Sequence, residues 1–407
     1  MSNSKSTFQK VFCLEGLWLD RVEPKEHFID LYVRKTTKTA RCPLCQKPSS
    51  RVHKTTRRTL KHMFCDDKVV RLKLTIRSFK CTCAEVRTFR ESIQGIDRRR
   101  TTAHFRFSLV PKVRDRSFSS VARETSLSAS SVARTAAAVM KAAAVTWPQE
   151  PFALGLDGHS FSGHDMMVTV TDVTHHDLLT ILPDDRQTTV KRFLKEISEI
   201  IKEKITCVCM DMDQGLRGAV HATLPHTSLV VDKFHVIQHF NEHLSDVRTL
   251  YTSSSFLLPK KLLEKNREDL NEHERKMLGK IFDRYPPVAE FWRMKEIMRS
   301  IYRIKSPSEA RRRFESLLDG LEFDHRPRWQ KLYRTLTSWK EDILNYFIYK
   351  ETNAYTEGVH TRIKLLKRIS YGFRNRTNYI AKMTIAFLPA TVLLDLIQRA
   401  EASPCLT

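Results

Sequence analysis

The sequence lacks any long hydrophobic run. No apolar stretch in its 407 residues reaches the roughly 18 residues that a membrane-spanning helix requires. The first ten residues, MSNSKSTFQK, are polar and lack the apolar core of a secretory signal. We therefore expect a soluble intracellular protein, long enough for two or three domains.

Acidic residues are scarce relative to basic ones. The chain carries 70 Lys and Arg against 46 Asp and Glu, a formal net charge of +24. The first 150 residues hold 31 Lys and Arg but 13 Asp and Glu, so a surplus of 18 lies in this part. A concentrated positive field favours a polyanion, most often nucleic acid. A basic protein without such a partner is the alternative, and the motifs within the same region argue against it.

The sequence contains nine cysteines. This odd count argues against a disulfide framework in a protein without an export signal. Four of them lie at metal-ligand spacing in RCPLCQK and FKCTC: Cys42, Cys45, Cys81 and Cys83. Four thiolates from two turns form a tetrahedral zinc site, and the alternating segment VVRLKLTIRSFKC predicts strands of a zinc ribbon. One residue separates the second pair, so His53, His62 or Cys65 could replace one of its ligands. Four reduced cysteines without a metal are the alternative.

A helix-turn-helix pattern follows the basic linker IDRRRTTAHFRFS. In SFSSVARETSLSASSVARTAAAVMKAAA, Val121 and Ala122 fit the inside of a first helix, and Ser126 takes the turn position. Ser128 fits an N-cap, and Val132 is the apolar anchor of the second helix. This helix would direct four residues toward a DNA major groove: Ser130, Ser131, Ala133 and Arg134. A plain helical hairpin fits the same pattern, and the positive charge of the region favours DNA.

From residue 151 the order of elements is three strands, a helix, a strand, a helix and a strand. This is the order of a ribonuclease-H-like fold, a mixed sheet flanked by helices. The segments FALGLDGHSF and ITCVCMDMD place Asp157 and Asp211 on strands that can be neighbours at the sheet centre. Two converging carboxylates form a hard-oxygen site suited to Mg²⁺.

Three residues near Asp211 need separate interpretation. Cys207 and Cys209 lie on its strand face and are interpreted as small buried core residues, the commoner fate of free cysteine. Asp213 can be a further ligand, an N-cap for the helix that starts at Gln214, or a solvated side chain.

A third carboxylate occurs far downstream, in NAYTEGVHTRIKLLKRISYGFRN. At about 100° per residue, one helix face carries Asn353, Glu357, His360, Thr361, Lys364 and Arg368. The opposite face carries Tyr355, Val359, Ile363 and Leu366 and is expected to pack on the core. A solvated helix with mixed charges is the alternative. After Glu357 the stretch has only basic charges through Arg376, which favours a place where a metal and a phosphate backbone meet.

These segments, in this order, resemble the ISL-three family of DDE transposases of bacterial insertion sequences. The resemblance spans nearly the whole chain and is carried by CPLC, RSFKC, LGLDGHS, CMDMDQGLRGAV, VVDKFHVIQHFNEHLSDVR and NAYTEGVHTRIKLLKRISYGFRN. It implies that Asp157, Asp211 and Glu357 are the catalytic triad and the ligands of two Mg²⁺ or Mn²⁺ ions. The sequence departs from the family at the short Cys81–Cys83 spacing and at His360, where the family more often has Asn.

The resemblance implies a multidomain α/β protein whose ribonuclease-H-like domain is interrupted by an α-helical insertion. The expected parts are a zinc-binding DNA-recognition domain (1–96), a helix-turn-helix (97–150), the first catalytic part (151–250), the helical insertion (251–350), and the Glu helix with the C-terminus (351–407). The insertion contains Trp292, Trp329 and Trp339.

The implied activity is metal-dependent cleavage and strand transfer on double-stranded DNA at terminal inverted repeats, in the bacterial cytoplasm at the nucleoid. Paired DNA ends imply a homodimer, and the zinc is structural. The expected phosphate contacts are Lys364, Lys367, Arg368, Arg374 and Arg376, interleaved with Tyr371 and Phe373 for base stacking. For Asp232 and His235 of DKFHV, a structural role is favoured over positioning of water or phosphate.

Two other functions remain open at this point. A zinc and helix-turn-helix regulator would bind DNA without metal-dependent cleavage, and Asp157→Asn would not change its function. A ribonuclease-H-like nuclease or resolvase would share the triad but would need no element ends, and the N-terminal DNA-reading modules argue against it.

Overall fold

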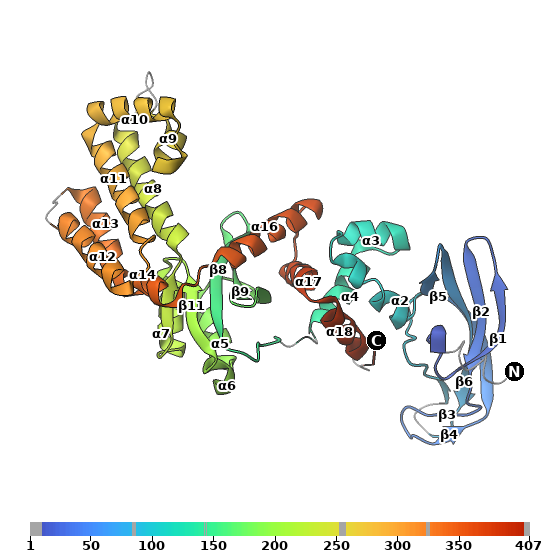
Figure 1. Ribbon diagram of the computed structural model, residues 1–407. Coiled ribbons are helices and arrows are strands. Elements are labelled where there is room, and N and C mark those ends of the chain that lie inside the picture. The colour runs from blue at the N-terminus through green and yellow to red at the C-terminus, as the bar shows by residue number, and fades with distance from the viewer. Residues whose placement is uncertain are drawn as a thin grey trace. The chain divides into compact units, whose positions relative to one another are not determined.

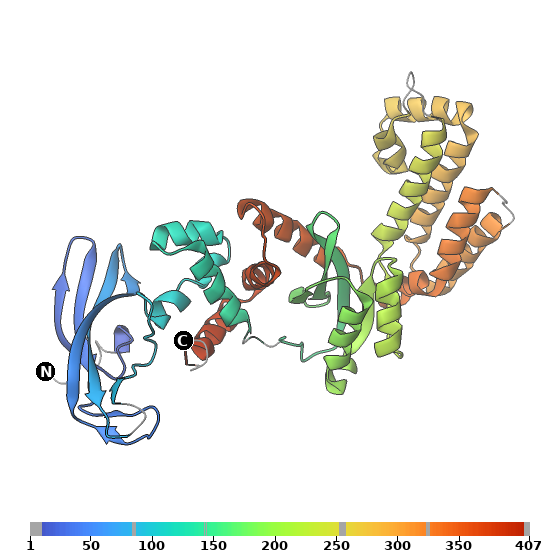
Figure 2. The same cartoon turned by 180° about the vertical axis from the view of Figure 1, so that it is seen from behind.

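The computed structural model describes residues 10–83, 87–141, 143, 145–251, 258–322 and 326–402. The polar N-terminus at residues 1–9 and Cys405 lie outside this part of the chain. The chain divides into two compact units, one formed by Met1–Ala144 with Ile363–Thr407 and the other by Val145–Arg362. Figure 1 and Figure 2 show their helices and strands from opposite sides.

The first unit contains a five-stranded sheet with the order β1-β2-β6-β5, in which β7 pairs with β6. Its strands are β1 (Leu17–Pro24), β2 (Phe28–Lys35), β5 (Val52–Cys65), β6 (Lys68–Lys80) and β7 (Thr88–Arg90). Strand β6 buries every second residue over Val70–Ile76, as the alternating sequence predicts. The sheet is larger than the zinc ribbon expected from the sequence. Strands β1 and β2 add to it, and β2 pairs with β6 in parallel.

Helices pack in the first unit after its sheet. They are α2 (Ala103–Phe107), the 3₁₀ helix η1 (Pro111–Val113), α3 (Phe118–Thr125), α4 (Ala129–Lys141), α17 (Arg376–Phe387) and α18 (Ala390–Ala402). Helices α17 and α18 contact α4 and η1 and share one apolar core with them. The buried Lys382 ammonium of α17 donates to the carbonyls of Val113 and Arg114 at 2.6 and 2.7 Å. Residues 351–407, expected as one part, are therefore divided after Arg362.

The second unit is built on a sheet with the order β10-β9-β8-β11-β12. The strands are β8 (Phe152–Ser162), β9 (Asp165–Asp172), β10 (Asp177–Leu182), β11 (Ile205–Met210) and β12 (Ser228–Val231). Strands β8, β9 and β10 pair antiparallel, whereas β11 pairs in parallel with both β8 and β12. The sheet is mixed, as the order of elements in the sequence predicts.

The two faces of this sheet carry different residues. Phe152, Leu154 and Leu156 of β8 belong to the main apolar core, which includes residues of α5 (Gln187–Glu196) and α7 (Gln214–Thr223). On the other face Ala153, Cys207, Cys209 and Val230 form a separate small cluster. A short helix, α6 (Glu199–Lys202), precedes β11. Small side chains on the second face allow helices to approach the sheet closely.

Helices make up the described chain between β12 and α16 (Ala354–Ile369), which includes the range 251–350 where a helical insertion is expected and also α8, which precedes that range. They are α8 (Lys233–Leu250), α9 (Lys260–Glu264), the 3₁₀ helix η2 (Arg267–Asp269), α10 (Glu272–Arg284), α11 (Pro286–Ile301), α12 (Pro307–Glu322), α13 (Pro327–Ser338), α14 (Lys340–Leu344) and α15 (Tyr346–Tyr349). Helices α8 and α11 run side by side (Figure 1). Trp292, Trp329 and Trp339 are buried, and Trp329 stacks on Phe291 at 3.8 Å between ring centroids. Helix α16 then returns to the sheet.

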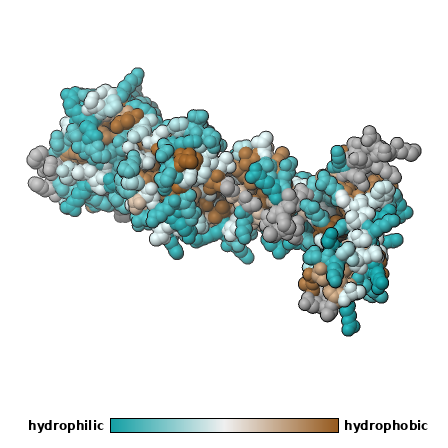
Figure 3. Space-filling view, turned by 90° about the horizontal axis from the view of Figure 1, so that it is seen from below, coloured by the Kyte–Doolittle hydropathy of each residue, from teal (hydrophilic) through white to brown (hydrophobic). Residues whose placement is uncertain are grey.

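The surface is mainly hydrophilic on the face shown in Figure 3, where apolar residues form small separate patches. Within the described part of the chain, none of the helices combines the length and apolar character that crossing a membrane would require.

Candidate active site and metal centre

Three aspartates lie at the same level of three neighbouring strands. Leu156 of β8 pairs with Met210 of β11, and Met210 pairs with Val231 of β12. The next residue in each case is an aspartate: Asp157, Asp211 and Asp232. Because these strands are parallel and paired in this register, the three aspartates lie side by side, in the middle of the long strand β8 and just after the ends of β11 and β12. The expected pair, Asp157 and Asp211, is therefore brought together.

The pKa values of both carboxyl groups of this pair are raised, in each case first by burial. Burial, and next the charge of Asp211, raise the pKa of Asp157 to about 7. Burial also raises the pKa of Asp211, while His235 at the start of α8 acts in the opposite direction on both groups. Two buried acids that resist ionisation side by side are typical of a site that a cation completes.

The donor set fits a divalent cation with oxygen ligands. Asp211 Oδ1 is buried and has no hydrogen-bond partner among the described residues. An ionised carboxylate without a donor is costly in a buried position, and Mg²⁺ takes carboxylate oxygens as ligands. Asp157 and Asp211 are the residues that would hold such an ion. His235 Nε2 is likewise buried without a hydrogen-bond partner in the described structure.

Asp232 has a structural role. Its Oδ1 accepts from the backbone N–H of Phe234 at 2.7 Å and thereby caps α8. Its Oδ2 accepts from the backbone N–H of Asn353 at 2.6 Å, immediately before α16. This fully buried carboxylate joins the two helices that flank the site, which agrees with the structural role favoured from the sequence.

Glu357 lies in the first turn of α16, and its side chain is exposed. The helix contacts the sheet through polar residues: Asn353 Nδ2 donates to the Leu156 carbonyl at 3.4 Å, and the hydroxyls of Thr356 and Thr171 lie 2.8 Å apart. Gly155 makes this approach possible, because a Cβ there would meet Thr171 Oγ1 at 2.3 Å and Thr356 Oγ1 at 3.0 Å. The sheet thus fixes the helix that carries Glu357.

The expected faces of α16 require one correction. Asn353 and His360 are buried, whereas the sequence places them on the face of Glu357, opposite the face expected to pack on the core. Asn353, Thr356 and His360 recur at helical spacing and point to the sheet, so the buried side is partly polar. The expected apolar residues Val359, Ile363 and Leu366 are buried as predicted.

Sequence reasoning missed a chain of polar contacts that ends at Asp157. His360 Nδ1 lies 3.5 Å from Asp157 Oδ2, and its Nε2 lies 2.9 Å from Thr169 Oγ1. Thr169 Oγ1 in turn lies 2.7 Å from His159 Nδ1. A signal was present, because Asp157 and His159 alternate on one strand and therefore share a face. The pairing of Asp157 with Thr169 required the fold.

The residues around Asp211 have clear roles. Asp213 Oδ1 accepts from the backbone N–H of Leu216 at 2.7 Å, so Asp213 is the N-cap of α7. Cys207 and Cys209 are fully buried core residues, as interpreted from the sequence.

The four predicted cysteines converge in the first unit. Their sulfur atoms all lie within 4.8 Å of one another, and within the described residues they are the group that meets this spacing for a metal. Cys42 and Cys45 lie between β3 (Ala40–Arg41) and β4 (Pro48–Ser49), and the second pair follows β6. Hydrogen bonds from turn N–H groups, first that of Cys45, lower the pKa of Cys42 to about 7 and favour its thiolate.

The alternative ligands lie elsewhere. His62 Nε2 is 2.7 Å from the Phe12 carbonyl oxygen and its Nδ1 is 3.1 Å from Thr102 Oγ1, whereas His53 and Cys65 are exposed on β5. The short spacing of Cys81 and Cys83 is accommodated, since their sulfurs lie 3.3 Å apart.

The two helices predicted on either side of Ser126 are present as α3 and α4. Ser126 between them has a φ of 53°, and Ser128 Oγ accepts from the backbone N–H of Ser131 at 3.2 Å. Ser130 and Arg134 are exposed and Ser131 is half-buried. Ala133 was expected at the same surface but is buried, because it shares the packing face of α4 with Val132 and Ala136.

The two aromatic residues in the basic segment after Glu357 have different environments. Lys364, Arg368, Arg374 and Arg376 are exposed and Lys367 is half-buried. Tyr371 is 98% exposed, with a φ of 55°. Phe373 instead packs against Phe118 and Tyr379 in edge-to-face contacts. Tyr371 is therefore available for a partner, whereas Phe373 contributes to the fold.

Comparison with known proteins gives two matches. A family model described as a transposase, of the DDE type and the ISL3 group, matches residues 154–383, more than half of the chain. The transposase for insertion sequence element IS1001 of Bordetella parapertussis is 22% identical over 396 residues, covering 92% of this chain and 96% of the relative.

Proposed function

Because the chain belongs to the ISL-three family of DDE transposases, we propose that it cleaves DNA at the terminal inverted repeats of an insertion sequence and transfers the freed strands to target DNA. The observation that carries this proposal is the pair of buried aspartates at one level of the central sheet. Burying two neighbouring carboxyl groups is unfavourable for folding, and a metal-dependent phosphodiester reaction gives a reason for the pair.

The catalytic domain is proposed to be ribonuclease-H-like. The strand order β10-β9-β8-β11-β12, with three antiparallel strands followed by two parallel ones, supports this assignment. Asp157 on the central strand and Asp211 after its parallel neighbour are two members of the proposed triad. Glu357, on the helix held against β8 and β9, is the third.

The proposed triad would hold two Mg²⁺ or Mn²⁺ ions. When bound, these ions would supply Lewis acid catalysis, which makes a water or a DNA 3′-hydroxyl a better nucleophile and stabilises the leaving oxygen. The protein's own contribution is positional. Asp232 and Gly155 fix α16, and His360 contacts the Asp157 carboxylate on the side away from Asp211's strand, toward β9.

DNA recognition is proposed for the first unit. The four-cysteine cluster is suited to a structural zinc ion, and α3 with α4 is proposed as a helix-turn-helix. Ser130, Ser131 and Arg134 would then face bases or phosphates. After the Glu helix, the exposed Lys and Arg residues would contact phosphates, and Tyr371 is the one of the two aromatic residues suited to stacking.

Further parts of the proposal follow from the reaction. Two element ends must be processed together, so we expect a homodimer on double-stranded DNA. The site of action is expected to be the bacterial cytoplasm, at the nucleoid.

The test is cleavage by the purified protein of DNA that contains the inverted repeats flanking its own gene. With Mg²⁺ or Mn²⁺, we expect new 3′ ends at the repeat boundary. The variants Asp157→Asn and Glu357→Gln should abolish these ends, whereas Asp213→Asn, which keeps an N-cap of α7, should retain them. Tight repeat binding without cleavage under either metal would instead support a DNA-binding regulator.

A further inference from the structure

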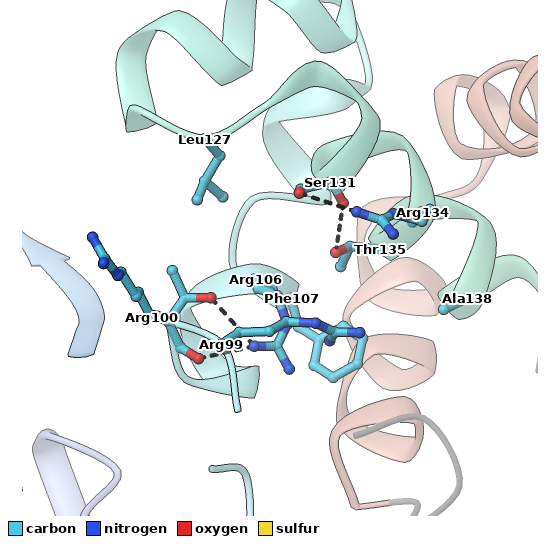
Figure 4. Close-up of a pocket in the computed structure, with 10 residues that line it drawn as sticks. Arg99, Arg100, Arg106, Phe107, Leu127, Ser131, Arg134, Thr135 and Ala138 are labelled. Atoms are coloured by element: carbon cyan, nitrogen blue, oxygen red, sulfur yellow. Dashed lines mark hydrogen bonds between the residues drawn. The ribbon is translucent and has the colours of Figure 1, made fainter. Parts of the chain in front are cut away.

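A cavity of about 310 Å³ lies beside α4 in the first unit. Its lining residues come from the basic linker, from α2 and from α4 with the preceding turn: Arg99, Arg100, Thr101, Arg106, Phe107, Leu127, Ser131, Arg134, Thr135 and Ala138. Figure 4 shows these side chains around the pocket. Four of the ten are arginines, and none is an aspartate or glutamate.

The linker backbone is fixed to the sheet, which holds its arginines at the pocket. The Arg58 guanidinium donates to the carbonyls of Asp97 and Arg99, each at 2.6 Å. The backbone N–H of Lys61 donates to the Arg100 carbonyl at 3.0 Å. A segment with three consecutive arginines is thus ordered by backbone contacts, and its guanidinium groups need not be used to hold it in place.

Arg106 forms a buried cationic wall of the cavity. Its Nη1 donates to the carbonyl and the hydroxyl of Thr101 at 2.9 and 3.2 Å, and its Nη2 donates to Asp97 Oδ2 at 2.9 Å. The side chain is about 6% exposed. Asp97 and Thr101 thus satisfy the buried guanidinium and hold it in a fixed position beside the cavity.

Positive charge is not balanced within this region. Asp97 is shared between Arg99 and Arg106, at 3.1 and 2.9 Å. Arg100 and Arg134 form no ion pair with any residue that the structure describes, and Arg134 donates hydrogen bonds to Ser130 and Ser131 of its own helix. The four guanidinium groups that line the cavity therefore have one carboxylate partner among them within the described residues, and it contacts only Arg99 and Arg106.

The remaining lining residues suit the parts of a nucleotide next to a phosphate. Ser131 and Thr135 supply hydroxyl groups, while Phe107, Leu127 and Ala138 supply apolar surface. The cavity is larger than one phosphate group, so the sugar attached to it could enter as well. Arginine is the side chain best matched to phosphate oxygens, which it binds through two parallel N–H donors.

We propose that this pocket binds a backbone phosphate of the DNA strand that runs beside α4. The inference rests on the proposed function, because it requires that DNA is bound along α4, at the proposed contact residues Ser130 and Arg134. Phosphate contacts of this kind fix the position of a protein on DNA without reading its sequence. The linker arginines then act with α4 as one DNA-binding surface.

The first experiment measures affinity for a duplex of unrelated sequence by fluorescence anisotropy, over a range of KCl and with EDTA present. Arg100→Gln should lower the slope of log K against log [KCl] by about one and weaken binding by roughly 5- to 10-fold. The matched control is Arg98→Gln, which removes the same charge from an exposed neighbour that does not line the pocket. A clearly smaller effect of the control supports the proposal, and equal effects overturn it.

A second variant tests the cavity itself. Ala138→Phe fills the pocket without changing the charge, so it should weaken DNA binding as much as Arg100→Gln does. Unchanged binding by a folded Ala138→Phe protein, checked by circular dichroism, would overturn the proposal. If this variant does not fold, the comparison of Arg98 with Arg100 still decides.

A small anion is the other source of the same chemistry. Inorganic pyrophosphate should compete with DNA and should raise the melting temperature of the wild type more than that of Ala138→Phe. If pyrophosphate stabilises the wild type but the pocket variants bind DNA normally, the pocket is a small-anion site and the DNA assignment is overturned. Failure of the wild type to bind any DNA would overturn the proposed function itself, whereas normal binding with insensitive variants overturns only this inference.

Discussion

At the scale of single residues, Asp157 stores unfavourable electrostatic energy in the absence of a cation. Its pKa is raised to about 7, first by burial and then by Asp211. The folded state therefore holds the proton more tightly than the unfolded chain, and this residue's contribution to stability is lost as the pH rises from about 4 to about 7. A bound divalent cation should restore the stability that is lost when Asp157 is deprotonated.

We predict that Asp157→Asn stabilises the metal-free protein at pH 8 by about 1–3 kcal/mol, with a smaller gain at pH 5, because each pKa unit corresponds to about 1.4 kcal/mol. Mg²⁺ should raise the melting temperature of the wild type at pH 8 but not that of the variant. Calorimetry at both pH values measures this. Asp213→Asn is the control, and an equal response of the two variants to Mg²⁺ would contradict the assignment of Asp157 as a ligand.

Tyr371 and Phe373 lie two positions apart and differ in exposure. Tyr371 is 98% exposed on a left-handed backbone, whereas Phe373 packs against Phe118 and Tyr379. An exposed aromatic ring among exposed arginines gains little from the fold and is available to stack on a base.

We predict that Tyr371→Ala leaves the melting temperature unchanged but weakens DNA binding by about 1–3 kcal/mol, the contribution of one stacked base. Phe373→Ala should instead mainly affect stability. It should lower the free energy of unfolding by about 1–3 kcal/mol, because packing contacts are lost. Thermal denaturation and binding titrations on both variants separate the two effects. A Tyr371→Ala protein that binds DNA normally would remove Tyr371 from the interface.

At the scale of elements, the position of Glu357 depends on how closely α16 approaches β8 and β9. The contact is made by Asn353, Thr356 and His360, and Gly155 provides the space for it. A buried polar interface of this kind is more specific than an apolar one, because its hydrogen bonds form in one register only.

We predict that Gly155→Ala costs about 1–3 kcal/mol and reduces cleavage more than DNA binding, because the added Cβ would meet the Thr171 hydroxyl at 2.3 Å and displace α16. The control is Gly358→Ala on α16. Because nothing lies within 4 Å of the added Cβ, this variant should be neutral or slightly stabilising. Chemical denaturation and single-turnover cleavage measure the two effects. Equal behaviour of the two variants would show that the close approach does not control Glu357.

At the scale of the whole molecule, the two compact units have different means of stabilisation. The unit of Val145–Arg362 has a large apolar core that spans the sheet and the insertion. In the other unit, the short strands β3 and β4 and the end of β6 meet at the cysteine cluster, whose apolar neighbours are few. A bound metal would therefore matter most in the cysteine-bearing unit.

We predict that the protein binds one Zn²⁺ and that a strong chelator, or Cys42→Ser, lowers the first of two calorimetric transitions while leaving the second unchanged. The reason is that a structural zinc contributes directly to folding of the segments it joins. Elemental analysis gives the stoichiometry. Loss of both transitions together, or no loss in either, would contradict an independent zinc-stabilised unit.

The sequence alone determined those features that depend on local pattern and on residue chemistry. Alternation identified β6, helical periodicity identified α5 and α16, and the spacing of cysteines identified all four members of the cluster. The order of elements indicated a mixed sheet in which the strands of Asp157 and Asp211 can be neighbours, and the structure pairs these two strands in parallel. These inferences succeed because each uses residues close together in the chain or a general rule of strand order.

Only the tertiary structure decided the contacts between distant segments. It paired Asp157 with Thr169, placed His360 beside them, and used Asp232 to join α8 to α16. It also buried Ala133 and Phe373, divided residues 351–407 between two units, and gathered arginines of the linker and α4 around one cavity. No periodicity in the sequence encodes these outcomes, because burial of a side chain depends on which other elements pack against its face.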